Sequence, residues 1–192
     1  MQLSPLEMKL ILGLAVLVLI LLIGVAFYVD GRRKTTAKLR KRFGSEYDRA
    51  VLQHGSGSKA EAKLEAREAR VEHLHIRDLT PAEHDRFAAD WLAIESRFVD
   101  HPKGSVTEAD ELVSSLMQSR GYPIADFEQR AADISVTHPR VVEFYRSAHS
   151  VAVRLASDEA TTEDLRTAII QYRTLFDELL HLPSSNDTRA VA

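Results

Sequence analysis

The chain has 192 residues, of which 45% are hydrophobic and 28% charged, and its formal net charge is −3. This balance excludes a collagen-like, low-complexity or wholly disordered chain. The sequence contains no cysteine, which excludes a disulfide framework, a thiol nucleophile and a thiolate metal site. Its few glycines and prolines favour helices over a turn-rich β fold.

The first predicted element is a membrane-spanning helix over residues 10–29, a run of twenty residues without a charge. At 1.5 Å per residue this run covers about 30 Å, the thickness of a bilayer's hydrocarbon core. A cleaved signal peptide is the alternative, but the run exceeds the usual apolar region of about 7–15 residues and no A-x-A-like site follows it. We therefore predict an uncleaved span, preceded by a short extracytoplasmic N-terminus at 1–9.

Seven basic residues follow the predicted span, and the bias of Lys and Arg toward the cytoplasmic side predicts a single-pass protein with its N-terminus outside and its remaining chain in the cytoplasm. The same residues are candidates for binding anionic lipid headgroups, although a topology signal alone is the simpler interpretation. They are Arg32, Arg33, Lys34, Lys38, Arg40, Lys41 and Arg42.

The charge reverses after this basic cluster. Residues 1–43 carry a net charge of +6 and residues 44–192 a net charge of −9. An acidic body is repelled by DNA, RNA and anionic bilayers. We therefore expect no nucleic-acid partner and a domain that does not lie on the membrane.

Residues 30–58 are predicted to form a basic juxtamembrane segment and linker. Apolar residues recur there every four positions, which indicates a helix that Gly44 would divide in two: Leu39, Phe43, Tyr47 and Val51. The run HGSGS at 54–58 predicts a flexible connector. Residues 59–74 are rich in helix formers but carry only a thin apolar seam, so this helix is expected to be half exposed or to pack against a partner.

The helix signals strengthen from Thr80 onward. Thr80 and Glu83 form a capping box, with Pro81 at the first helical position. The helix that follows carries an apolar stripe at spacings of four, three and four residues, and we predict that it forms the centre of the core. The stripe consists of Phe87, Trp91, Ile94 and Phe98.

Four further helices are predicted, over 106–121, over 124–134, from Thr137 onward and from a cap at Thr161 or Thr162 to a stop at Pro183. Because no segment shows the period-2 alternation of a strand, the predicted fold class is all-α. It consists of one N-terminal transmembrane helix followed by a soluble bundle of five or six helices in a domain over 59–182. The polar tail at 183–192 is predicted to be flexible.

The sequence contains none of the common nucleotide-binding, hydrolase or metalloprotease motifs. Glu-x-x-His occurs twice, as Glu72–His75 and Glu178–His181, and ferritin-like bundles hold a di-iron centre with two such pairs. Glu178 and His181 fall on the side of their helix opposite its apolar stripe, where they could not share an enclosed metal. We therefore predict no metal, no cofactor and no catalytic residue, and we expect a protein that is not an enzyme.

Other candidate chemical groups have simpler interpretations. The acidic neighbours Asp110 and Glu111, like Asp126 and Glu128, are typical of solvated helix faces. His149 shares its helix with two serines, but the sequence indicates no fixed acid beside it.

A stretch over 120–146 mixes four aromatic residues with arginines. Tyr and Arg are enriched where protein partners bind, so this stretch is the candidate partner surface. The alternative is that its aromatics belong to the core and its arginines cover them. The candidate residues are Arg120, Tyr122, Arg130, Arg140 and Arg146.

Four blocks of the sequence resemble a bacterial family of small single-span membrane proteins that has an all-helical soluble domain and no assigned activity. They are RFGSEYDRAV (42–51), FVDHPKGSVTEADELV (98–113), RGYPIADFEQRAADISVTHPRVVEFYR (120–146) and TTEDLRTAIIQYRTLFDELL (161–180). The resemblance covers about 42–180. It implies a bacterial source, and hence the bacterial inner membrane, but it carries over no functional residue.

The predicted function is that of a membrane-anchored helical interaction or scaffold protein, with a lipid bilayer and an unidentified protein as partners. An enzyme or ligand-binding bundle whose site no motif reveals is one alternative. A structural membrane protein that self-associates is another. A concave pocket with converging titratable groups would favour the first alternative, whereas an exposed patch would favour an interaction protein.

Overall fold

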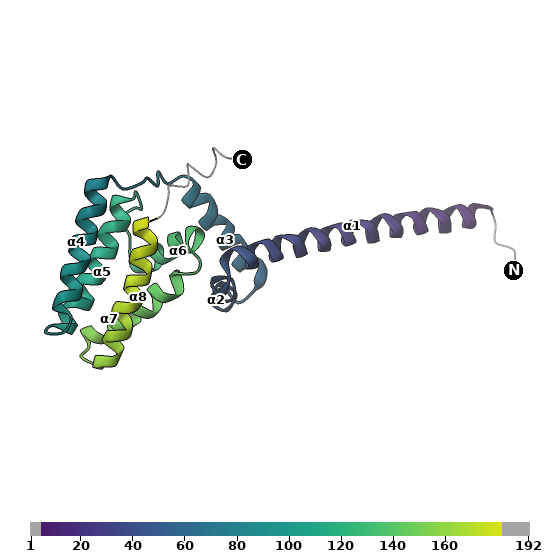
Figure 1. The fold of residues 1–192 in the computed structure, drawn as a ribbon. Helices are drawn as coiled ribbons and strands as arrows, with labels where there is room; N and C mark the ends of the chain where they lie inside the picture. Colours follow the sequence, from purple (N-terminus) through teal and green to yellow (C-terminus); the bar gives the residue numbers. More distant parts are fainter. Residues whose placement is uncertain (1–4, 182–192) are drawn as a thin grey trace. The chain divides into compact units, whose positions relative to one another are not determined.

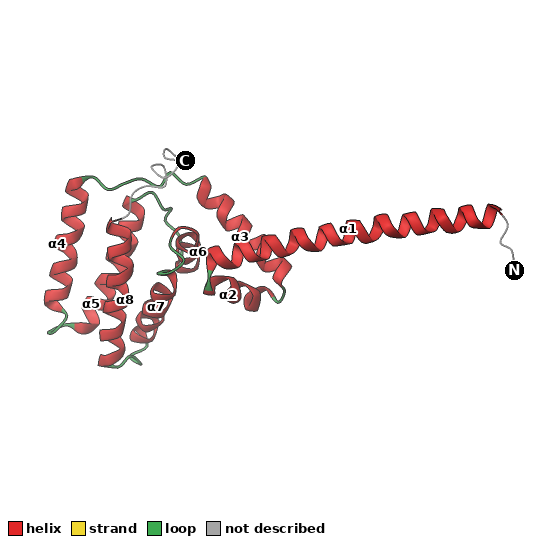
Figure 2. Cartoon of the chain, turned by 45° about the vertical axis from the view of Figure 1, so that its right-hand side comes forward, coloured by secondary structure: helices red, strands yellow, loops and turns green. Residues whose placement is uncertain are grey.

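The computed structural model describes residues 5–181, with side chains for residues 13, 14 and 17–181. Over these residues the chain forms helices and no strand, so the all-α prediction is confirmed (Figures 1 and 2). The chain divides into two compact units, Met1–Lys41 and Arg42–Ala192. Residues 1–4 of the predicted N-terminal segment and the tail at 183–192 lie outside the described residues.

Helix α1 (Pro5–Phe43) carries both the apolar run and the basic cluster without interruption. Over the described residues, no helix combines the length and the apolar character that crossing a membrane requires, and the prediction of a transmembrane helix at 10–29 is therefore wrong. Charged residues begin at Asp30 and continue through the basic cluster on the same helix. The side chains of 10–12 and 15–16 lie outside the described residues.

Helix α2 (Ser45–His54) starts after Gly44, which adopts a left-handed φ of 54° that glycine tolerates without steric cost. The predicted division of the helical pattern at Gly44 is confirmed. The compact unit thus begins near this point, at Arg42, rather than at residue 59.

Helix α3 (Gly57–Glu72) follows α2 after only two residues. Gly55, with φ 72°, ends α2, and Ser56 already caps α3 by accepting a hydrogen bond from the Lys59 amide at 3.4 Å. The residues that we predicted to form a flexible connector therefore form a tight turn, because each of them serves a helix end.

The remaining helices are α4 (Pro81–Arg97), α5 (Pro102–Ser119), α6 (Phe127–Thr137), α7 (Val142–Ala156) and α8 (Thr162–His181). Helix α8 packs against both α5 and α7, and α5 packs against α4 as well (Figure 1). The predicted capping box of α4 is present: the Glu83 amide donates to Thr80 Oγ1 at 3.2 Å, and the Thr80 amide donates to the Glu83 carboxylate at 2.9 Å.

The main core lies among α4 to α8 and contains Phe87, Trp91 and Ile94 of the predicted stripe, with Phe98 packed against it. Trp91 is fully buried and stacks on Phe176 of α8, with ring centroids 4.7 Å apart. Each large side chain buried in this way contributes about 1.5–3 kcal/mol to folding. The helix predicted over 124–134 begins later than expected: Ile124 is 84% exposed, and α6 begins only at Phe127, after the cap residue Asp126.

Gly121 directly follows the last turn of α5 with φ 96°, the left-handed conformation that a glycine adopts where a helix ends. Its backbone lies so close to the preceding loop that a Cβ here would come within 2.3 Å of the His75 carbonyl oxygen. The Arg77 amide also donates to the Arg120 carbonyl at 2.9 Å. The loop that leads into α4 is therefore held against the end of α5.

Candidate functional site

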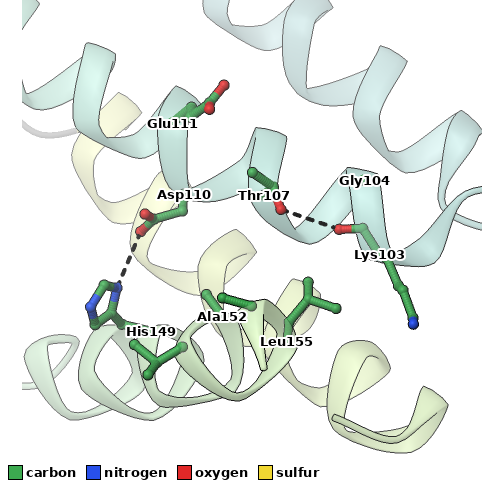
Figure 3. A pocket seen from close by; sticks show the side chains of 10 residues that line it. Lys103, Gly104, Thr107, Asp110, Glu111, His149, Ala152 and Leu155 are labelled. Carbon is green, nitrogen blue, oxygen red and sulfur yellow. Dashed lines mark hydrogen bonds and ion pairs between the residues drawn. The ribbon is translucent and has the colours of Figure 1, made fainter. Parts of the chain in front are cut away.

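A groove of about 580 Å³ lies between α5 and α7 (Figure 3). Residues three, four or seven positions apart on a helix share a face, which is why each helix lines the groove with a regular series of side chains. Helix α5 supplies Lys103, Gly104, Thr107, Asp110 and Glu111, and α7 supplies His149, Ala152, Val153, Leu155 and Ala156.

The polar end of the groove is formed by Asp110 and His149, which point toward one another across it (Figure 3). The Tyr172 hydroxyl of α8 donates to Asp110 Oδ1 at 3.0 Å. His149 Nδ1 lies 3.8 Å from the same oxygen, which is too far for a hydrogen bond. This nitrogen is buried and has no hydrogen-bond partner among the described residues.

The electrostatics keep both neighbours of Asp110 uncharged. Burial lowers the pKa of His149, although the Asp110 carboxylate opposes this effect. Burial, together with the nearby Asp110 charge, raises the pKa of Tyr172 far above its ordinary value. At neutral pH the imidazole is therefore neutral and the phenol protonated, and neither neutralises the carboxylate.

Aromatic packing fixes the position of His149. Its ring stacks on Phe127 with centroids 3.6 Å apart and planes within 8° of parallel. Phe127 in turn meets the buried ring of Tyr145 edge-on, at 4.8 Å. The imidazole is thus part of the wall of the groove.

Asp110 and His149 have the residue types of an acid–base pair, but the groove does not assemble a nucleophile with them. Among its lining residues the one hydroxyl is that of Thr107, which donates to the Lys103 carbonyl at 3.4 Å. A Ser-His-Asp arrangement needs a hydroxyl hydrogen-bonded to the imidazole. The geometry suits binding better than covalent catalysis.

From the sequence, Asp110 was predicted to lie on a solvated helix face and His149 to have no acid beside it. Both residues lie on helices that the sequence predicted. Nothing in either stripe specifies that α5 and α7 lie side by side, and this packing is what brings the two side chains together.

The predicted partner surface is largely engaged inside the protein. Arg120 is 3% exposed, and its Nη1 donates to the Leu179 carbonyl at the end of α8, at 2.7 Å. Tyr122 is also buried, and its hydroxyl lies 3.0 Å from Thr137 Oγ1. Both side chains stabilise the junction of α5, α6 and α8.

The other three residues of this surface are dispersed. Arg130 Nε donates to the Tyr145 hydroxyl at 3.0 Å, and Arg146 Nε donates to the Glu46 carboxylate at 2.8 Å. Arg140 is exposed. These contacts favour the alternative interpretation, in which the aromatics belong to the core and the arginines cover it.

The two Glu-x-x-His pairs are not built into a metal centre in the part of the chain that the structure describes, since no three His, Asp or Glu side chains there are placed to hold an ion. His181 Nδ1 lies 2.9 Å from the Asp177 carbonyl oxygen. Glu178 lies 3.8 Å from Nδ1 of His138.

A second candidate site lies on α1, where apolar and basic side chains adjoin. The large apolar side chains described between Leu14 and Val29 are all exposed, from 39% at Val29 to 76% at Phe27. The basic cluster follows directly. Within it, Lys34 pairs with Asp30 at 2.8 Å, and both side chains are exposed to solvent.

Comparison of the chain with protein-family models, with curated proteins and with solved structures found no match. The function is therefore argued from the geometry and charge of these two sites.

Proposed function

We propose that the protein is a helical interaction protein held at an anionic lipid surface by α1. The observation that carries this function is the exposed apolar run from Leu17 to Val29. Contiguous apolar surface is rare on monomeric soluble proteins and marks a site that binds lipid or protein. Insertion of these side chains into a lipid surface is favourable because it removes apolar area from water.

The charge next to the apolar run supports an anionic lipid as its partner. Seven basic residues lie between positions 32 and 42. Each basic residue near an anionic bilayer contributes about 1 kcal/mol to binding. Residues 44–192 carry a net charge of −9, so the same surface repels them and leaves them accessible to other proteins.

Vesicle flotation of the full chain tests this function. We compare vesicles of phosphatidylcholine with vesicles of phosphatidylcholine mixed with phosphatidylglycerol, and expect preferential binding to the second. Removing four exposed charges of the cluster should reduce this preference on the order of 100-fold or more, at about 1 kcal/mol per charge. The variant combines Arg33→Gln, Lys34→Gln, Lys38→Gln and Lys41→Gln.

A matched control removes four exposed basic residues from the acidic unit instead: Lys59→Gln, Lys63→Gln, Arg86→Gln and Arg140→Gln. It changes the net charge equally and should keep the preference for anionic vesicles. Equal binding of the wild type to both vesicles, or an equal loss in the control, would contradict a lipid role for α1. A chain that self-associates through α1 and does not bind vesicles would also contradict it.

A further inference from the structure

The groove between α5 and α7 has an acidic end formed by Asp110 and Glu111 of α5. Among the described residues, Asp110 forms no ion pair with a lysine or arginine, and its neighbour His149 is neutral at pH 7. Some other carboxylates of the bundle are paired with arginine, as Asp164 is with Arg154 at 2.9 Å. Glu111 adds a second negative charge at the rim, where its side chain points away from α7 (Figure 3).

The rest of the groove is apolar and open. Ala152 and Leu155 of α7 point toward α5 (Figure 3), and Val153 beside them is 56% exposed. On the opposite helix Gly104 has no side chain, and no atom lies within 4 Å of the position that its Cβ would occupy. Lys103, at the far end, is already paired with Asp158. Small side chains on both helices therefore leave room for a bulky apolar group.

We propose that this groove binds an amphipathic basic helix of a partner protein. A Lys or Arg of the partner would meet Asp110, within the field of Glu111, and its apolar residues would cover Ala152, Val153 and Leu155. A groove between two helices is a recurrent acceptor for the apolar face of a third helix. Charge complementarity selects a basic helix over an acidic one. This partner site is separate from the lipid-binding role of α1 and does not depend on it.

The probe is a synthetic amphipathic helix of Leu, Ala and Lys, compared with the same peptide carrying Glu in place of Lys. Binding to the full chain is measured by fluorescence anisotropy of the labelled peptides, and only the Lys peptide should bind. The double variant Asp110→Asn/Glu111→Gln should weaken its affinity about tenfold, as expected for loss of a charge-assisted hydrogen bond. Asparagine can still accept the hydrogen bond from Tyr172, so the bundle keeps its packing.

The matched control is Asp90→Asn/Glu65→Gln, which removes two exposed carboxylates from α4 and α3 and should leave the affinity within about twofold. An equal loss in both variants would show that the peptide responds only to net charge and would overturn the assignment. So would binding of the Glu peptide with equal affinity, or no binding of the Lys peptide.

A photocrosslinking amino acid in the protein shows where the peptide binds. Placed at Val153, it should capture the Lys peptide. Placed at Leu92 of α4, which is similarly exposed at 62%, it should not. Capture at Leu92 but not at Val153 would place the peptide elsewhere and exclude the groove as its binding site.

Discussion

His138 is a buried histidine that the fold holds neutral. It follows α6, and only 14% of its side chain is exposed. Burial, together with the nearby positive charge of Arg120, lowers its pKa from 6.5 to about 4. Glu178, at 3.8 Å, would favour the charged imidazole, but its own side chain is 45% exposed, and solvent screens its charge.

Because of this histidine, we expect the folded protein to lose stability as the pH falls. Because the pKa of His138 is lower in the folded than in the unfolded chain, the unfolded chain binds more protons between about pH 4 and 6.5. His138 therefore imposes no penalty above pH 6.5 and destabilises the fold as the pH falls toward 4. Between pH 7 and pH 5 the free energy of unfolding should fall by about 2 kcal/mol from this residue alone.

Urea denaturation of the wild type and of His138→Gln at both pH values measures this effect. The variant should lose about 2 kcal/mol less than the wild type on acidification. His101→Gln, at an exposed position, serves as the control and should behave as the wild type does. An unchanged acid loss in His138→Gln would show that other groups cause it.

At the residue scale, the sequence predicted burial well where helical spacing decides it. Phe87, Trp91 and Ile94 recur on one helix face and are all buried. Spacing could not predict Arg120, because its burial depends on the Leu179 carbonyl, an acceptor that only the tertiary fold places within reach. Sequence reasoning therefore wrongly places on the surface those polar residues whose hydrogen-bond partners are distant in the sequence.

At the scale of elements, the α2–α3 hairpin is joined to the bundle by ion pairs to two buried carboxylates as well as by the packing of α3 on α6. Among the described residues, the main core contains none from α2 or α3. Glu46 of α2 is 4% exposed and accepts from Arg146 of α7, and Asp133 of α6 is 1% exposed and accepts from Arg70 of α3 at 3.1 Å. Buried ion pairs add little net stability but penalise misplacement strongly, so these pairs specify how the hairpin docks.

Breaking one of these pairs should loosen the hairpin selectively. Glu46→Gln removes the buried counter-charge of Arg146 and Arg67, while Arg146 keeps its pair with the exposed Glu128 carboxylate at 2.8 Å, so the variant should cost about 2–3 kcal/mol. Amide hydrogen exchange should then accelerate in α2 and α3 and stay slow in α8. Glu163→Gln breaks the exposed pair with Arg166 and should cost less than about 1 kcal/mol. Uniform acceleration across all helices would contradict selective docking.

Helix boundaries were predictable where local capping chemistry sets them, as at Thr80 and Gly121. The turn at 54–58 was not, because the Gly and Ser residues of a flexible linker are also those of helix caps. The α5–α7 groove was missed for a different reason. The apolar residues of a helix predict which of its faces is buried, but they do not predict which other helix packs against that face.

At the scale of the whole molecule, the bundle has a core of its own and should fold without the hairpin. A chain that starts at residue 74 retains every residue of the main core. It should give helical circular dichroism and a single cooperative thermal transition. Trp91→Ala in the same fragment removes the stacked ring and should cost about 3–5 kcal/mol. A fragment that melts gradually would show that the hairpin is required for the bundle to fold.

The all-α class was predictable for the whole chain because helical periodicity is present throughout and strand alternation is absent. The transmembrane helix was predicted wrongly from the number of uncharged residues in one run. Over the described residues no helix is both long enough and apolar enough to cross a membrane.

The stacking of Trp91 on Phe176 determines what optical spectroscopy can detect in this protein. Trp91 is the sole tryptophan of the chain, and it lies between α4 and α8, so its emission reports on the packing of these two helices. Release of the hairpin leaves that environment unchanged and is silent in tryptophan fluorescence. Stepwise unfolding would therefore lower the ellipticity at 222 nm before the emission maximum shifts to the red, and the gap between the two curves would measure how independently the hairpin melts.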